Sequence, residues 1–369
     1  MAHLGYFHRE FVLRRGWLDE ASWGDMVSLC QFLPGPASSQ TGILIGLARA
    51  GYGGAAAAWI GFTVPSAAAM VAFAYAAPAI NAAVGEGWVH GLKLAAVAVV
   101  ALAVVTMARG QAADLPRAVL AVAAAAVTLV LRSPYAPVVA ILLGISFGLM
   151  FLRRGERARR PALPLPIGRR AGTAFLALFF GLLLALPVAA AMLGAHGLDE
   201  AARFYRVGSL VFGGGHVVLP LLQNAVVDAG WVSRDAFLAG YGAVQAVPGP
   251  LFTFAAYLGA SMTAPPSGLA GAAICLGAIF LPSFLLVFGV APFWETLRRS
   301  ALAQGGLRGA NAAVVGVLAA ALYDPVWTGA VSRPGDVAVV AAAFAALLIL
   351  RAPAWLVVIA SALAGGLIA

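Results

Sequence analysis

Two Pro-Gly-Pro tripeptides are the residues of this chain most suited to form a binding site. They occupy residues 34–36 and 248–250, each within an apolar stretch. Proline lacks a backbone N–H and clashes with the carbonyl four residues earlier, so each tripeptide breaks a helix. Broken backbone at membrane depth is tolerated only against protein or a water-filled cavity. The next helix then begins with unpaired N–H groups at the positive end of its dipole, which favours a bound anion.

Polar side chains near both breaks could replace the hydration shell of such an anion. Gln31 precedes the first tripeptide by three residues, and Gln245 precedes the second at the same spacing. One isolated tripeptide could serve only to kink a helix for packing, whereas two matched copies indicate a site near the membrane midplane. The predicted substrate-binding residues around the breaks are Gln31, Pro34, Gly35, Pro36, Ser38, Ser39, Gln245, Pro248, Gly249, Pro250 and Thr253.

A third interruption is the glycine run in Phe212-Gly213-Gly214-Gly215-His216. Its glycines could form a nest of N–H groups or could simply allow close helix packing. Gly213, Gly214 and His216 join the predicted substrate-binding set, and His216 could also carry a proton near neutral pH. Asp25 and Asp324 lie close to apolar spans and are further candidates for proton coupling. Lys93, at the start of its helix, is expected to snorkel to the membrane interface.

The composition places these residues in a membrane. The chain has 369 residues, of which 62% are hydrophobic and 10% charged, with a mean hydropathy of +0.95. Such a chain cannot be a soluble enzyme, a disulfide scaffold or a disordered regulator, because each needs far more polar residues or cysteine. The two cysteines, Cys30 and Cys275, lie in apolar runs and are expected to be small core residues. We predict no metal site and no cofactor.

The apolar segments predict an all-α polytopic membrane protein with about 10–13 transmembrane segments, since a helix of roughly 20 residues spans the hydrocarbon core. Three apolar regions are interrupted, namely 24–48, 204–227 and 236–262. The nine clear spans are 54–75, 92–107, 115–131, 135–152, 171–193, 268–290, 307–323, 337–350 and 354–369.

The charges orient these spans rather than form a nucleic-acid surface. The net charge of +9 includes 23 basic residues, all but Lys93 being arginine, and most of them lie between apolar segments. Residues 153–170 contain seven arginines and one glutamate, so the positive-inside rule places this linker in the cytoplasm. The loop at 76–91 then falls outside, and the loop containing Arg109 falls inside.

The chain repeats itself at an offset of 214 residues. This offset aligns both Pro-Gly-Pro tripeptides, and with gaps of three or four residues it also aligns Pro65-Ser66 with Pro282-Ser283 and Gly91 with Gly309. Residues 204–215 have no counterpart in the first half, because position 215 aligns with Met1, so we expect a truncated start that leaves one half of the site incomplete. The predicted division is a first repeat at 1–152, the linker at 153–170, a connecting helix and loop at 171–203, and a second repeat at 204–369.

The orientation of the two repeats depends on the broken segments. If each Pro-Gly-Pro segment crosses the membrane once, the repeats are inverted and the loop at 291–306 is cytoplasmic. If each segment turns back, the repeats are parallel. We favour inverted repeats with single crossings, because loop charge sets orientation and this plan recurs in transporters. This choice places Arg14 and Arg15 outside, against the rule.

The sequence resembles the two-domain form of the chromate ion transporter family over nearly its whole length. The motifs that carry the resemblance are FHREFVLRRGWLDE at 7–20, CQFLPGPASSQTGILIG at 30–46, GFTVPS at 61–66, VFGGGHVVLPLLQ at 211–223 and AVQAVPGPLFTFAAYLGA at 243–260. The resemblance implies a multi-pass protein of the bacterial inner membrane that exports chromate, driven by the proton motive force. The absence of a GxxxxGK[ST] loop agrees with transport without ATP.

The resemblance also implies functional roles for residues at all three interruptions, and for Arg9, Arg14 and Arg15, which would attract an oxyanion at the entrance. Its expected partners are a chromate-like oxyanion and the lipid bilayer, with a homodimer left open. Chromate and sulfate are both tetrahedral dianions, so a sulfate or other oxyanion transporter is the alternative function. An intramembrane hydrolase pairing Ser66 or Ser283 with His216 is a remote alternative.

Overall fold

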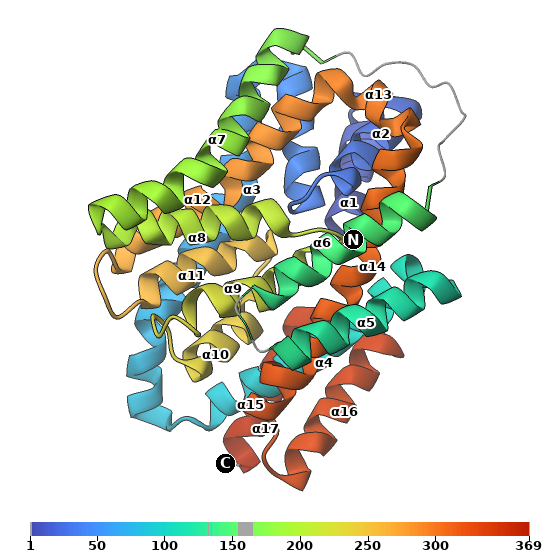
Figure 1. Ribbon diagram of the computed structural model, residues 1–369. Coiled ribbons are helices and arrows are strands. Elements are labelled where there is room, and N and C mark those ends of the chain that lie inside the picture. The colour runs from blue at the N-terminus through green and yellow to red at the C-terminus, as the bar shows by residue number, and fades with distance from the viewer. Residues whose placement is uncertain (1, 132, 134, 154–164, 369) are drawn as a thin grey trace.

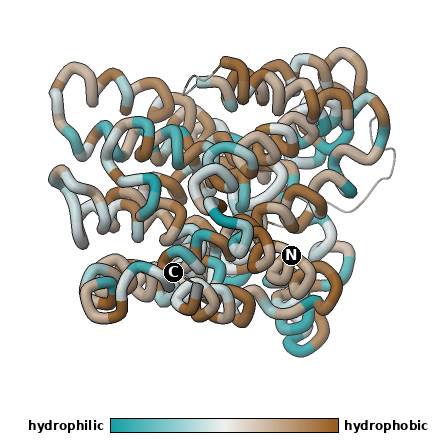
Figure 2. The backbone as a smooth tube through the Cα atoms, turned by 90° about the horizontal axis from the view of Figure 1, so that it is seen from below, coloured by the Kyte–Doolittle hydropathy of each residue, from teal (hydrophilic) through white to brown (hydrophobic). Residues whose placement is uncertain are grey.

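The computed structural model describes residues 2–131, 133, 135–153 and 165–368, and the regular structure of these residues is helical throughout (Figure 1). Five of its helices are long and apolar enough to cross a membrane, and five shorter ones are apolar. Figure 2 shows hydrophobic residues along most of the helices, with hydrophilic residues in shorter stretches. The predicted all-α polytopic membrane fold is confirmed.

Nine continuous helical segments of the described chain correspond to the nine predicted spans. They are the later part of α3 (Ala37–Val84), α4 (Gly87–Gln111), α5 (Leu115–Leu131), α6 (Ala136–Phe151), α7 (Arg169–Leu193), α12 (Gly268–Val290), α14 (Ala301–Ala321), α16 (Pro334–Leu348) and α17 (Ala354–Ile368). The linker predicted at 153–170 ends inside α7, and its residues 154–164 lie outside the described part of the chain.

The second Pro-Gly-Pro segment forms a hairpin whose tip is the tripeptide. Helix α10 (Arg234–Val244) leads to the tip, and η3 (Leu251–Thr253) and α11 (Phe254–Ser261) lead away from it. The Tyr257 hydroxyl donates to the Ala236 carbonyl at 2.9 Å, which joins the two arms far from the tip. The prediction that this segment crosses the membrane once is therefore wrong.

The first Pro-Gly-Pro segment folds in the same way. Helix α2 (Glu20–Phe32) leads to its tip, and α3 leads back as far as a bend at Ala50 and Gly51. The Arg49 guanidinium lies 4.7 Å from the ring centre of Trp17, so the two arms lie together at their ends away from the tip. The bend brings Gly46 against Gly54, and the second half repeats this contact between Gly259 and Gly271.

The glycine run at 213–215 forms the tip of a third hairpin. Helix α8 (His196–Leu210) leads to it, and η2 (Gly215–Val217) and α9 (Val218–Val226) lead away. The Arg203 guanidinium donates to the Ala225 carbonyl at 3.2 Å across the two arms. Because α8 begins at His196, the repeat boundary predicted at residue 204 falls within a helix.

Equivalent long helices of the two halves run antiparallel. Tyr52 of α3 contacts Phe288 of α12 with ring centres 5.2 Å apart, and Trp59 contacts Phe284 at 5.8 Å. Farther along α3, Tyr75 lies beside Gly268 at the start of α12. Residue numbers rise along one helix as they fall along the other, as inverted repeats require. The repeats are inverted despite the hairpins, because α8–α9 and α10–α11 both return to the side from which they enter.

The hairpin fold also removes the conflict between the positive-inside rule and the predicted outside position of Arg14 and Arg15. Arg15 and Arg49 lie on Trp17, 4.9 and 4.7 Å from its ring centre. Tyr52, just beyond Arg49, contacts Phe175 near the start of α7 with ring centres 6.0 Å apart. Arg15 therefore lies at the end of the bundle that carries the basic linker, and not at the opposite end.

The two halves interlock through exchanged helices. Helix α4 packs against α16 and α17, while its equivalent α14 packs against α5 and α6 (Figure 1). Glycines permit both contacts: a Cβ at Gly91 would collide with the Ser361 carbonyl, and one at Gly309 with the Gly144 carbonyl. Small residues let membrane helices approach closely, so each half is held by the last two helices of the other.

The topology predicts which side of the membrane labels each loop. In a chain with Cys30 and Cys275 replaced by Ala, we expect Glu86→Cys to react with an impermeant maleimide from outside the cell. Arg14→Cys and Thr296→Cys should react only from the cytoplasm, because the hairpin at 34–36 and both hairpins of the second half are re-entrant. Labelling of Arg14→Cys from the same side as Glu86→Cys would contradict the hairpin at 34–36.

Candidate functional site

Each Pro-Gly-Pro tip packs against the long helix of the other half. Gly35 has φ +127°, and a Cβ there would lie 2.8 Å from Ser283 Oγ. Gly249 has φ +154°, and a Cβ there would lie 2.6 Å from Ser66 Cβ. Ser66 and Ser283 are equivalent in the repeat, so the two contacts are reciprocal. Only glycine combines this backbone geometry with so close an approach.

The glycine-run tip joins the two Pro-Gly-Pro tips. The backbone N–H of Gly35 donates to the Val211 carbonyl at 2.7 Å, where α8 ends. On the other side, a Cβ at Gly215 would lie 3.6 Å from Leu251, the first residue after the second tripeptide. The structure thus brings together the three interruptions that the sequence predicts as one site.

Three helix starts lie at these tips without side-chain caps. Helix α3 begins at Ala37, η2 begins at Gly215 and η3 begins at Leu251, and none has a capping hydrogen bond from a side chain. The first N–H groups of a helix have no partner within it, and the helix dipole adds partial positive charge. The tips therefore offer backbone donors and positive potential, as an anion requires.

Buried polar side-chain atoms without partners surround the tips. Within the described residues, no hydrogen bond reaches Ser39 Oγ, Ser283 Oγ, Gln245 Nε2 or Gln40 Oε1. Leaving such a group unpaired costs roughly 1–3 kcal/mol, so each needs an explanation. The two hydroxyls and the amide nitrogen are donors, which is the set that an oxyanion would satisfy. Thr253 instead donates its hydroxyl to the Pro250 carbonyl at 2.9 Å.

The sequence reasoning missed two glutamines at the tips. Gln40 is fully buried, and its Nε2 donates to the Pro34 carbonyl at 2.7 Å. Gln111 Nε2 donates to the Gly213 carbonyl at 2.8 Å. Gln40 lies one turn after Pro36, a spacing that could have indicated a contact with the broken backbone. Nothing in the sequence indicates that Gln111, at the end of α4, reaches the glycine run.

The second half carries a polar chain that the first half lacks. His216 Nδ1 lies 2.9 Å from the Tyr241 hydroxyl, and Tyr241 lies on α10 four residues before Gln245. Val27 replaces Tyr241 at the equivalent position of the first half. Gln31 is exposed whereas Gln245 is half-buried, so the two matched glutamines occupy different surroundings. The site is symmetric in its backbone and asymmetric in its side chains.

The predicted entrance arginines lie away from the tips. Arg9, Arg14 and Arg15 are exposed, and the last two form ion pairs with Glu10. Hydrogen bonds from Arg15 and Arg14 lower the pKa of Glu10, which keeps it charged. These arginines could attract an anion to the bundle end, but they do not contact the tips.

The remaining predicted charges also occupy the ends of the bundle. Asp324 pairs with Arg234 at 2.7 Å, and both side chains are about half exposed. Asp25 pairs with a buried arginine, described below. Lys93 Nζ donates to Asp235 Oδ1 at 2.9 Å, and Asp235 is largely exposed, so snorkelling of Lys93 to the interface stays a prediction. No spacing in the sequence indicates this acidic partner on α10.

A cavity of about 770 Å³ opens at the bundle end opposite the start of α7, which is the predicted outer end. Its lining includes Lys93, Asp235, Ala239 and Tyr257, and thus reaches the arms of the α10–α11 hairpin. Neither Pro-Gly-Pro tripeptide lines it. This cavity therefore lies beside the arms of the α10–α11 hairpin and does not include the tips.

The hydrolase alternative finds no support in the serine contacts. Ser66 donates its hydroxyl to the Thr63 carbonyl at 3.0 Å, and Ser283 faces Gly35. His216 instead contacts Tyr241. Among the described residues, no group of three or more His, Cys, Asp or Glu could hold a metal ion. Cys30 and Cys275 are separately buried, as predicted for small core residues.

The reciprocal contacts predict a sharp cost for a methyl group at either tip. We expect Gly249→Ala to lower the free energy of unfolding by about 1–3 kcal/mol, because this φ is unfavourable for alanine and its Cβ would collide with Ser66. Gly61→Ala is the matched control, since a Cβ there meets no atom within 4 Å. Thermal unfolding in detergent measures both variants, and equal melting temperatures would contradict the close contact.

Comparison with known proteins matches both halves of the chain to one family. The family described as chromate transporter matches residues 1–149 and 198–366, which lie on either side of α7. A probable chromate transport protein of Synechococcus elongatus is 26% identical over 87% of this chain and 79% of its own length. A chromate transport protein of Cupriavidus metallidurans is 24% identical over 87% and 77%. No solved structure matches the chain.

The matched residues include both Pro-Gly-Pro tips, the glycine run and both Pro-Ser pairs. The relatives are named as transport proteins and not as enzymes. Since the family covers most of the chain, this protein belongs to the chromate transporter family.

Proposed function

We propose that this protein is a secondary transporter that exports chromate across the bacterial inner membrane. The observation that carries the proposal is the meeting of three uncapped helix starts with buried, unpartnered donors at the junction of the inverted halves. The names of the relatives in Synechococcus elongatus and Cupriavidus metallidurans supply chromate as the substrate. The basic linker supplies the orientation, with Arg153 in the cytoplasm.

Neutral donors at the tips suit a transported dianion. Backbone N–H groups at Ala37 and Leu251 would replace water around the oxygens, and Ser39 and Gln245 would add side-chain donors. The side chains seen to hydrogen bond to the tripeptides, Gln40 and Thr253, are neutral. A fixed cation would hold a dianion strongly, whereas helix dipoles and neutral donors permit both binding and release.

The inverted halves suit alternating access. Each half places its Pro-Gly-Pro tip against the long helix of the other, so a rocking motion of one half moves both walls of the site. Both copies of the tip belong to a single chain, so the proposal requires only one protomer, and a homodimer remains a prediction.

We place proton coupling at His216, because it is the titratable side chain of the glycine-run tip. Its contact with Tyr241, which lies on α10 four residues before Gln245, links it to the second Pro-Gly-Pro tip. A proton on His216 would add positive charge beside the bound oxyanion, so that binding of the proton and binding of the oxyanion would favour each other. Asp25 and Asp324 are engaged in ion pairs at opposite ends of the bundle.

Transport into inside-out vesicles tests the site. We expect Gln245→Ala and Ser39→Ala to lower the initial rate of chromate uptake about tenfold or more, because each removes a hydrogen bond to a charged ligand. Gln223→Ala is the control, since Gln223 is likewise half-buried but lies on α9. Undiminished uptake in both site variants would contradict the site.

The same vesicles separate the alternative substrate and the driving force. We expect a protonophore to abolish uptake of chromate, and His216→Gln to uncouple uptake from the pH gradient. Uptake of sulfate in preference to chromate would support the alternative of a sulfate transporter. Insensitivity of chromate uptake to the protonophore would contradict proton coupling.

A further inference from the structure

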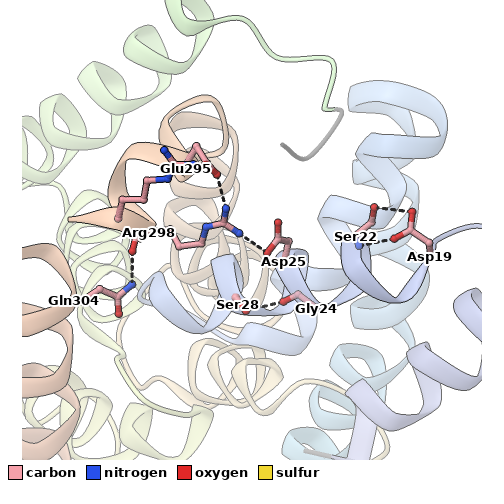
Figure 3. A network of polar contacts seen from close by, with 9 residues as sticks. Asp19, Ser22, Gly24, Asp25, Ser28, Glu295, Arg298 and Gln304 are labelled. Atoms are coloured by element: carbon pink, nitrogen blue, oxygen red, sulfur yellow. Dashed lines mark hydrogen bonds and ion pairs between the residues drawn. The ribbon is translucent and has the colours of Figure 1, made fainter. Parts of the chain in front are cut away.

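A buried ion pair joins the two halves at the bundle end opposite the cavity. Arg298, in α13 (Trp294–Arg299), donates from Nη1 to Asp25 Oδ1 on α2 at 2.8 Å (Figure 3). The two side chains are only 2% and 4% exposed. Glu295 accepts from Arg298 Nη2 at 2.6 Å. Removing charges from water is costly, so a buried pair between the halves calls for a reason beyond stability.

The internal repeat shows which residues occupy the equivalent place at the opposite end of the bundle. At the offset of 214 residues, Asp25 corresponds to Ala239, which lines the outer cavity. Arg298 corresponds to the end of α3, near Asn81, which also lines that cavity. The same place between the halves is therefore open at the outer end and filled by an ion pair at the cytoplasmic end.

The ion pair is coupled to the first Pro-Gly-Pro tip through one short helix. Asp25 lies on α2, the arm that leads directly to Pro34. Phe32, at the end of that arm, packs on Trp294 of α13 with ring centres 5.6 Å apart. A displacement of Asp25 from Arg298 would therefore move the arm that carries the tip.

One N–H group of the Arg298 guanidinium makes no hydrogen bond to the described residues. Its Nε is buried and has no hydrogen-bond partner within the described residues, while Nη1 and Nη2 engage carboxylates. A guanidinium binds a tetrahedral oxyanion through two parallel N–H groups. Arg299, by contrast, is about half exposed and pairs only with Glu295 among the described contacts.

We propose that Arg298 and Asp25 form the cytoplasmic gate, and that Arg298 is the group that first binds the oxyanion there. The incoming oxyanion replaces the Asp25 carboxylate as a partner of the Arg298 guanidinium. Its negative charge then repels the Asp25 carboxylate, which moves α2 away and opens the path to the tips. The proposal rests on the proposed function, because it assigns the entrance of an exporter.

The native cysteines report on the gate without any transport. Cys30 lies on α2 beyond Asp25 and is 1% exposed, and Cys275 lies on α12 and is fully buried. In proteoliposomes in chloride buffer, we expect Asp25→Asn and Arg298→Gln to speed N-ethylmaleimide labelling of Cys30 at least about tenfold, since a broken buried pair is strongly destabilised. Cys275 should remain unlabelled, as should both cysteines in the control Arg299→Gln.

Mass spectrometry of the labelled peptides separates the outcomes. Selective exposure of Cys30 supports a gate, and the exchanged pair Asp25→Arg with Arg298→Asp should restore slow labelling. Equal exposure of both cysteines would show that the pair is only a structural brace and would overturn the gate. Unchanged labelling of Cys30 would overturn it as well. Because no oxyanion is present, these results do not depend on chromate being the substrate.

Arg298→Lys tests the oxyanion-binding role separately. Lysine keeps the charge beside Asp25, so Cys30 should stay protected, but it lacks the two-pronged donor. In inside-out vesicles we expect the KM for chromate to rise about tenfold with little change in kcat. An unchanged KM would overturn the binding role. Absence of transport in the unsubstituted protein would contradict the proposed function and leave the labelling result standing.

Discussion

The reciprocal contact of each Pro-Gly-Pro glycine with the Pro-Ser pair of the other half is the constraint on which the structure depends. Gly35 meets Ser283 and Gly249 meets Ser66, at approaches that a Cβ would prevent. These contacts hold two broken backbones within the protein, where their free polar groups can be satisfied. They also ensure that neither half can form its site alone. The exchanged packing of α4 and α14 repeats the same principle away from the centre.

The hairpins explain how an apolar chain presents polar backbone at its centre. Each hairpin returns to the side from which it enters, so its tip contributes the start of a helix without adding a crossing. Three such starts converge between the inverted halves, with Ser39, Ser283 and Gln245 providing unpartnered polar atoms. The two ends of the bundle differ, because a cavity opens at one and the Arg298–Asp25 pair fills the equivalent place at the other.

Much of this arrangement could be predicted from the sequence. Apolar length identifies the nine spans, and prolines in register identify the repeat and the tips. The prediction that each Pro-Gly-Pro segment crosses the membrane once was wrong. Loop charges indicate only the side on which a loop lies, and two successive hairpins return the chain to the same side, as two successive crossings would. Gln111, Tyr241 and the partner of Lys93 escaped prediction, since they reach the site or the cavity through contacts between distant helices that no local spacing encodes.

We propose that both halves bind one oxyanion at the joined tips. A structure determined with bound chromate tests it most directly. We expect density for one anion within hydrogen-bonding distance of the helix starts at Ala37 and Leu251, with Ser39 or Gln245 as a side-chain donor. An anion bound only in the outer cavity, beside Lys93, with the tips unliganded, would contradict it.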